Sequence, residues 1–282
     1  MKFDPPPRPK SDFHFWWFVT RRCNNHCPHC LRYDIGDQGE ELDARTAKRL
    51  LLEYGEYLRA HGKTSSIAFG GANPICREDL PDLLNICRDF IEKGIFVKPV
   101  GILANPQGVD LAYAKMMKEC GIERFTVSID GLKATNDAMR GEGNFDAAIA
   151  CLDVLAEAGI YADVKFTAIR KTYKEYAAVC ELVAKHGVTK VMPGRLILEG
   201  GGKAMKDEAL TDEEWEAFLK ANDIEMPRFP PNFQPSKLPN FQTSHFVIMA
   251  GGEIRPNRRG PALGHWPEES LEKLIAKLNE VE

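Results

Sequence analysis

A regular alternation of apolar segments with amphipathic segments constrains the fold more than any other feature of this chain. Apolar, β-branched or aromatic segments, typical of buried strands, lie at 13–20, 65–71, 95–102, 124–131, 161–169 and 189–198. Segments with apolar residues at helical spacing lie between them at 42–61, 79–93, 109–120, 144–158 and 173–186. Glycine stands directly after the first four of these, at Gly62, Gly94, Gly121 and Gly159. This alternation predicts parallel strands joined by right-handed crossovers, either in an open doubly wound sheet or in a partial barrel.

The residues best able to do chemistry follow the ends of three of these strands. A cluster of cysteines follows 13–20, the sequence Gly-Gly-Ala-Asn-Pro occupies 70–74, and Ser128 and Asp130 close 124–131. Because sites in parallel α/β folds lie at the carboxyl ends of the strands, we expect these groups to meet there.

The pattern changes after residue 200. Residues 211–223 predict a helix, the proline-rich stretch 226–240 predicts an extended connection, 245–257 predicts a hairpin turning at Gly251-Gly252, and 268–278 predicts a short amphipathic helix. We therefore divide the chain into an N-terminal arm (1–12), a main domain (13–200) and a C-terminal region (201–282).

Three of the eight cysteines form a C-x3-C-x2-C run, at Cys23, Cys27 and Cys30. Three thiolates on one loop can ligate three corners of an iron–sulfur cube, and the lack of a nearby fourth cysteine leaves one iron open for a substrate. Spacing alone leaves zinc as an alternative, with His26 or His29 as fourth ligand. The other cysteines are expected to be small buried side chains, with Cys76 close to the proposed site.

The cysteine run, the 70–74 segment and the block from Ser128 to Arg140-Gly141 together resemble the radical S-adenosylmethionine (SAM) superfamily. The C-terminal hairpin is similar to that of the SPASM/twitch branch, which includes peptide maturases, but Asn257 stands where that branch has a cysteine. The resemblance implies a partial (β/α)6 TIM-type barrel with a small C-terminal α+β cap. It also implies one [4Fe–4S] cluster, held by Cys23, Cys27 and Cys30, and bound SAM.

Site residues for SAM follow from the same resemblance. The 70–73 segment would receive the amino group, the block after the fourth strand would hold the carboxylate, and the residue before the last cysteine would lie near the adenine. The residues implied are Gly70, Gly71, Ala72, Asn73, Ser128, Asp130, Arg140 and His29. Asn73 replaces the usual acid, so this ammonium contact should be weaker, and Asn136 stands where histidine is usual.

The implied activity is reductive cleavage of SAM to a 5′-deoxyadenosyl radical, which abstracts hydrogen from a peptide or amino-acid-derived substrate. Maturation of a peptide natural product is favoured by analogy with the branch. The alternatives are a radical SAM enzyme of small-molecule cofactor or antibiotic biosynthesis and, from another class, a non-catalytic zinc or Fe–S binding protein.

Expectations about partners come from charge and from the ends of the chain. No cysteine follows Cys180, which predicts a single cluster served by an external electron donor of the flavodoxin or ferredoxin type. The first strand begins at residue 13, which suggests a separate protein for leader-peptide recognition. The net charge of −4 and the absence of a long apolar run argue against nucleic-acid and membrane partners and favour a cytoplasmic location. Trp16 and Trp17 are expected in the core.

Overall fold

The computed structural model describes residues 10–33, 40–98, 100–224, 244–257, 260–278 and 280. Its strands form one sheet in the order β6-β5-β4-β3-β2-β1-β7-β8-β9. They are β1 (Phe13–Thr20), β2 (Ser65–Gly71), β3 (Val100–Leu103), β4 (Ile122–Ser128), β5 (Tyr161–Ala168), β6 (Val191–Arg195), β7 (Ser244–Ile248), β8 (Glu253–Arg255) and β9 (Gly264–His265). The α-helices are α1 (Ala44–Ala60), α2 (Leu80–Glu92), α3 (Leu111–Glu119), α4 (Lys133–Arg140), α5 (Asn144–Glu157), α6 (Tyr176–Ala184), α7 (Asp212–Ala221) and α8 (Leu271–Leu278).

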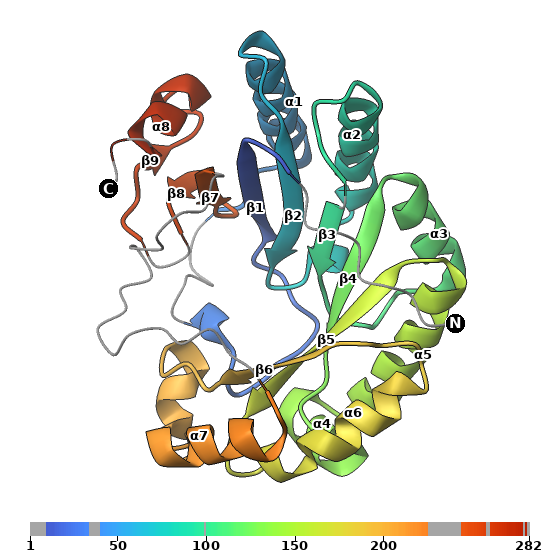
Figure 1. The fold of residues 1–282 in the computed structure, drawn as a ribbon. Coiled ribbons are helices and arrows are strands. Elements are labelled where there is room, and N and C mark those ends of the chain that lie inside the picture. Colours follow the sequence, from blue (N-terminus) through green and yellow to red (C-terminus); the bar gives the residue numbers. More distant parts are fainter. Residues whose placement is uncertain are drawn as a thin grey trace.

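The strand order confirms the partial barrel. Neighbouring strands from β1 to β6 are consecutive in the chain and all pair in parallel. Within these six strands the order does not reverse, as it does in a doubly wound sheet. Figure 1 shows the sheet curving, with the crossover helices along its outer side. The winding places the carboxyl ends of six parallel strands around one open centre.

The residues of β1 alternate between two environments. Phe15 and Trp17 face the helices and are fully buried in the main core, as predicted for Trp17. Trp16 lies on the opposite face, is only partly buried and is absent from that core, so its prediction as a core residue is wrong. The period of two in a strand explains the difference, because adjacent residues point to opposite faces.

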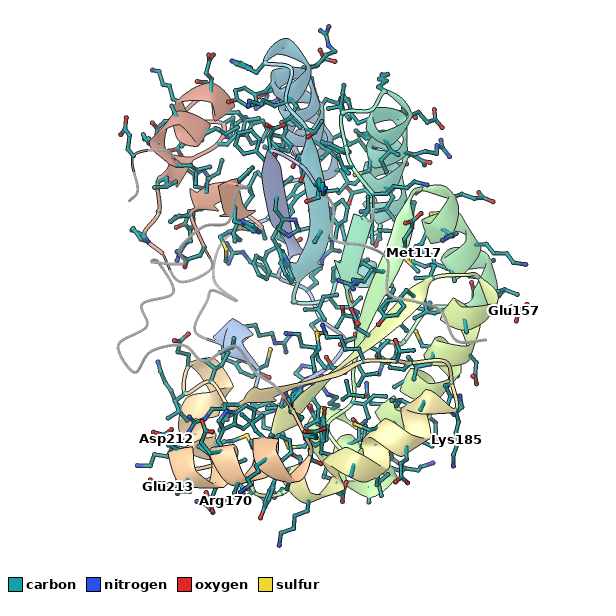
Figure 2. All side chains as sticks on the ribbon, viewed as in Figure 1. Met117, Glu157, Arg170, Lys185, Asp212 and Glu213 are labelled. Atoms are coloured by element: carbon teal, nitrogen blue, oxygen red, sulfur yellow. The ribbon has the colours of Figure 1, made fainter. Side chains whose placement is uncertain are left out.

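The helices follow the same inside–outside division. Met117 of α3 is fully buried between its helix and the sheet, whereas Glu157 and Lys185 point outward at the far ends of α5 and α6 (Figure 2). Among the described residues, no helix is long and apolar enough to cross a membrane.

Two predicted elements differ from those observed. The sequence predicts a strand over 95–102, but the structure has only β3, which begins at Val100. Before it, Phe96 makes a single bridge to Ser65 and buries its side chain in the core. The segment between the strand expected at 124–131 and the helix expected at 144–158 contains α4, whose N-cap residue, Leu132, makes no side-chain capping bond. Only Asn136 and Met139 of this short helix are buried, so it lacks the stripe of several apolar residues that reveals a helix in a sequence.

The C-terminal strands continue the same sheet. Strand β7 pairs in parallel with β1, from Phe13 opposite Ser244 to Trp17 opposite Ile248. The predicted hairpin is confirmed as β7 and β8, and its turn requires glycine: Gly252 has φ +97° and an added Cβ would lie 2.2 Å from the carbonyl oxygen of Trp266. The predicted extended connection at 226–240 and most of the predicted arm lie outside the described residues.

Candidate active site

A cavity of about 240 Å³ opens at the carboxyl ends of the parallel strands. Eight of the eleven site residues predicted from the sequence line it: Cys23, Cys27, His29, Cys30, Gly71, Ala72, Ser128 and Arg140. The lining also contains Asn25, Leu31, Leu103, Ala104, Asn105, Thr167, Arg195, Leu196 and Ile197. Every one of the first six strands therefore contributes to this cavity through its last residues or the loop that follows.

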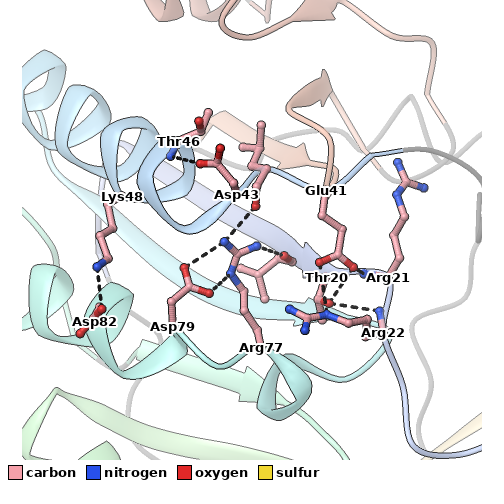
Figure 3. Close-up of polar contacts among 12 residues, drawn as sticks. Thr20, Arg21, Arg22, Glu41, Asp43, Thr46, Lys48, Arg77, Asp79 and Asp82 are labelled. Atoms are coloured by element: carbon pink, nitrogen blue, oxygen red, sulfur yellow. Dashed lines mark hydrogen bonds and ion pairs between the residues drawn. The ribbon is translucent and has the colours of Figure 1, made fainter.

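The base of the cysteine loop is anchored by buried polar contacts (Figure 3). The guanidinium of Arg77, only 2% exposed, donates to the carbonyl oxygens of Val19 and Leu42 and pairs with Asp79. The carboxylate of Glu41 accepts from the hydroxyl of Thr20 at 2.9 Å and from the next backbone N–H. These bonds fix the end of β1 to the loop before α1 and to the turn after β2, so the cysteine loop starts from a rigid point.

The glycines at 200–202 explain why the βα pattern breaks there. The backbone N–H of Gly201 donates to the carbonyl oxygen of Cys30 at 2.9 Å. A Cβ on Gly201 would lie 2.0 Å from the carbonyl oxygen of Pro28, so only glycine lets this turn reach the cysteine loop. The chain after β6 thus closes over the back of the loop that carries the thiols.

The three predicted iron ligands lie on this loop and face one cavity. The backbone N–H of Cys30 donates to the carbonyl oxygen of Cys27, which turns the last two cysteines toward the same side. Burial raises the pKa of the Cys27 thiol, while the positive charge of Arg140 opposes that shift. In the described part of the chain, no three cysteine, histidine or acidic side chains converge closely enough to hold a single metal ion.

Asp130, Arg140 and His29 form a polar cluster at one side of the cavity. Asp130 is fully buried, and one carboxylate oxygen accepts from the backbone N–H of Thr167 at 2.7 Å. The other oxygen pairs with Arg140 at 2.7 Å and lies 3.5 Å from Nε2 of His29. Asp130 itself does not line the cavity. Burial lowers the pKa of His29 to about 4, against the opposing effect of the Asp130 carboxylate, so the ring is neutral at pH 7.

Asn136, which replaces the usual histidine of this block, is fully buried behind the cluster. Its side-chain oxygen accepts from the backbone N–H of Asp130 at 2.9 Å, and its amide donates to the side chain of Asn144 at 3.1 Å. These two bonds connect the loop after β4 with the start of α5. The side chain therefore fixes the backbone that carries Asp130.

The 70–74 segment is divided between the cavity and the sheet. Gly71 and Ala72 line the cavity, whereas Gly70 packs against the indole of Trp16, whose Nε1 would lie 2.4 Å from an added Cβ. Asn73 is fully buried and does not line the cavity. Its side-chain oxygen accepts from the backbone N–H of Asn105 at 3.1 Å.

Asn105, after β3, is a cavity residue that the sequence analysis missed. Its side-chain amide nitrogen lies 3.2 Å from the sulfur of Cys23. The signal that could have found it is a repeated tripeptide, because Ala-Asn-Pro follows β2 at 72–74 and β3 at 104–106. Neighbouring parallel strands bring their following residues side by side, so two such turns meet at one edge.

The side chains that line the cavity fit the two cofactors that the sequence suggests, a [4Fe–4S] cluster and SAM. Three thiols on one loop, without a fourth cysteine lining the cavity, provide three ligands to a [4Fe–4S] cluster and leave its fourth iron open. Ser128 and the paired Arg140, whose Nη1 lies 3.9 Å from the sulfur of Cys27, are suited to a carboxylate such as that of SAM.

The chain is similar to known proteins in its sequence. The sequence model of the radical SAM superfamily matches residues 17–170. The chain is 32% identical over 200 residues to Fe-coproporphyrin III synthase of Methanosarcina barkeri, covering 70% of this chain and 47% of that protein. It is 27% identical over 176 residues to the mycofactocin maturase MftC of Mycolicibacterium smegmatis, covering 61% and 42%. The chain thus spans about half the length of these curated relatives.

Solved structures share the fold. Native anSMEcpe with bound AdoMet superposes with a TM-score of 0.69 at 17% identity, covering 95% of this chain and 82% of that one. The family match brings with it the two cofactors predicted from the sequence, a [4Fe–4S] cluster and SAM. Since that match includes the cysteine loop, the strand ends of β2 and β4 and more than half of the chain, this protein belongs to the radical SAM superfamily.

Proposed function

We propose that this chain is a radical SAM enzyme whose cluster is held by Cys23, Cys27 and Cys30. The observation that carries the proposal is the cavity itself, which these cysteines line together with Ser128 and Arg140 at the carboxyl ends of the strands. When bound, the cluster and SAM supply one-electron cleavage of SAM and removal of a hydrogen atom from the substrate.

The residues of this chain bind and orient those groups. Arg140 offers its guanidinium to the carboxylate of SAM while Asp130 holds it from behind, and Ser128 adds a hydroxyl beside it. The backbone of Gly71 and Ala72 provides carbonyl acceptors for the amino group. The neutral ring of His29 provides a flat surface for the adenine. In this arrangement Gly70, Asn73 and Asp130 act from outside the cavity, by supporting the residues that line it.

Anaerobic reconstitution with iron and sulfide tests the proposal. The protein should turn brown, bind about four irons per chain and release 5′-deoxyadenosine from SAM under dithionite, as measured by chromatography. The Cys27→Ala variant should lose both properties, because two thiolates do not hold the cube. Cys180→Ala, at a half-buried cysteine on α6, is the matched control and should retain both. A colourless protein with one tightly bound zinc ion would contradict the assignment.

We propose further that the substrate is a peptide or an amino-acid-derived molecule. The support is the similarity to MftC, a maturase by name. A tetrapyrrole of a cofactor pathway is the second candidate, favoured by the higher identity to Fe-coproporphyrin III synthase. The electron would come from an external flavodoxin or ferredoxin, and a peptide substrate would call for a separate leader-recognition protein.

Substrate-dependent 5′-deoxyadenosine formation separates the two candidates. The reconstituted enzyme is incubated with coproporphyrin III compounds or with short peptides encoded beside its gene, and product formation is compared with that of SAM alone. Stimulation together with a mass change in the peptide supports the first candidate. The same response to the tetrapyrrole alone supports the second and refutes the first.

A further inference from the structure

Three asparagine side chains link three loops beside the predicted cluster. Asn24 belongs to the cysteine loop, Asn73 follows β2 and Asn105 follows β3. The amide nitrogens of Asn73 and Asn105 lie 3.0 Å and 2.9 Å from the side-chain oxygen of Asn24. The side-chain oxygen of Asn73 in turn accepts from the backbone N–H of Asn105 at 3.1 Å. The three amides therefore form a continuous hydrogen-bonded network.

The network determines which atom of Asn105 faces Cys23. A backbone N–H can only donate, so the atom of Asn73 that meets the N–H of Asn105 must be its oxygen. The other amide atom of Asn73 is then the nitrogen, and its partner on Asn24 must be an oxygen. That oxygen also faces the side chain of Asn105, which must present its nitrogen there. The same nitrogen lies 3.2 Å from the sulfur of Cys23.

Both hydrogens of this amide thus have an acceptor. One points to the oxygen of Asn24 and the other to the sulfur of Cys23. The backbone N–H of Asn25 lies 3.4 Å from the same sulfur. Cys23 therefore accepts one bond from its own loop and one from the loop after β3, which carries no cysteine of the run.

We propose that Asn105 is a positioning residue that donates an N–H···S hydrogen bond to Cys23 and raises the reduction potential of the cluster. The proposal rests on the proposed function, because it requires Cys23 to ligate a [4Fe–4S] cluster. A donated hydrogen bond stabilises negative charge on a ligating sulfur. The reduced cluster carries one more negative charge than the oxidised cluster, so the bond stabilises the reduced form more and makes reduction easier.

Asn105→Leu tests the bond, because leucine has a similar size and has no donor. Anaerobically reconstituted wild-type and variant proteins are titrated with a reductant, and the reduced cluster is followed by electron paramagnetic resonance. We expect Asn105→Leu to retain its iron and to show a clear shift of the potential to more negative values.

Asn24→Ala is the matched control. It removes the shared acceptor of the network but leaves Asn105 within reach of Cys23, and Asn24 itself is exposed. Its potential should stay close to that of the wild type. An unchanged potential in Asn105→Leu, or an equal shift in Asn24→Ala, would overturn the proposal.

A second measurement, on proteins that keep Asn105, covers the case in which Asn105→Leu binds no iron. Wild-type protein and Asn24→Ala, labelled with 15N in the asparagine side chains, should both show a weakly coupled nitrogen in pulsed resonance spectra of the reduced cluster. The lack of such a coupling would refute the bond. One outcome is that the wild-type protein binds the cluster and cleaves SAM, while no nitrogen coupling is seen and Asn105→Leu shows no shift of the potential. That result refutes this inference alone and leaves the proposed function intact.

Discussion

At the scale of single residues, the site separates groups that face the cavity from groups that hold them. Arg140 lines the cavity, whereas Asp130, its partner, is fully buried and bonded to the backbone of β5. A charged pair of this kind keeps the guanidinium in one orientation before any ligand arrives, which lowers the entropy lost on binding. The sequence motif identifies both residues but does not show which of them lies behind the other.

Half-buried His14 should make folding stability depend on pH. Its ring packs 5.0 Å from that of His245, and burial, reinforced by that neighbour, lowers the pKa of His14 to about 4. The unfolded chain, with an ordinary histidine pKa, binds a proton between pH 6.5 and 4 that the folded chain does not. The free energy of unfolding should therefore fall as the pH drops through this window, by about 1–2 kcal/mol between pH 7 and pH 5.

Urea unfolding of His14→Gln measures this contribution. Its free energy of unfolding should fall by about 1–2 kcal/mol less than that of the wild type between pH 7 and pH 5. His61→Gln, at an exposed helix end, is the control and should keep the full dependence. Equal pH dependence in the wild type and His14→Gln would show that His14 is not responsible.

At the scale of elements, the sequence predicts most of the barrel. Helix α1 has the clearest signal, with Asp43 as N-cap accepting from the N–H of Thr46 and apolar residues on one face. Prediction failed where tertiary contacts decide the conformation. The chain before β3 makes only a single bridge to the sheet, at Phe96. Helix α4 is held by Asn136, whose partners Asp130 and Asn144 lie outside the helix on either side of it.

The same limit applies to the site. The cysteine run and Arg140 belong to sequence motifs, so their placement in one cavity could be expected from strand order. The direction of Asn73 and the approach of Asn105 to Cys23 depend on the register between β2 and β3, which no local pattern encodes. The sequence therefore predicts many residues of the site, but not the contacts between neighbouring loops, such as that of Asn105 with Cys23.

The packing of Trp16 on Gly70 predicts a strong coupling between β1 and β2. Gly70→Ala should lower the free energy of unfolding by about 1–3 kcal/mol, because the new Cβ would lie 2.4 Å from the indole nitrogen. Thermal or urea unfolding measures the loss. In a protein that already carries Trp16→Ala, Gly70→Ala should lower the free energy of unfolding much less, because the indole is absent. Additive effects of the two substitutions would contradict direct contact as the cause.

At the scale of the whole molecule, the described C-terminal segment and the barrel share one core. Trp266 is 1% exposed, and its indole N–H donates to Glu53 of α1 at 2.9 Å. The guanidinium of Arg49, also on α1, lies 4.7 Å from the centre of the indole ring. Leu274 and Ile275 of α8 belong to the same core cluster.

Trp266→Ala should therefore destabilise the entire chain, by about 3–5 kcal/mol, in one cooperative transition. Calorimetry and circular dichroism should report the same lowered midpoint. Leu52→Ala, which removes an exposed apolar side chain from α1, is the control and should have a small effect. A separate low-temperature transition for the C-terminal segment, with the barrel unaffected, would show that the two unfold independently.

The position of β1 between β2 and β7 has a consequence for synthesis on the ribosome. One neighbour of β1 follows about forty-five residues later, but the other, Ser244–Ile248, is more than two hundred residues downstream. At typical elongation rates, on the order of tens of seconds pass before that partner is made. During this interval Phe13–Thr20, which contains six aromatic residues counting His14, presents an unpaired edge of the type that aggregates. The nascent chain should therefore need protection by a chaperone at its first strand, the strand that leads into the iron ligands.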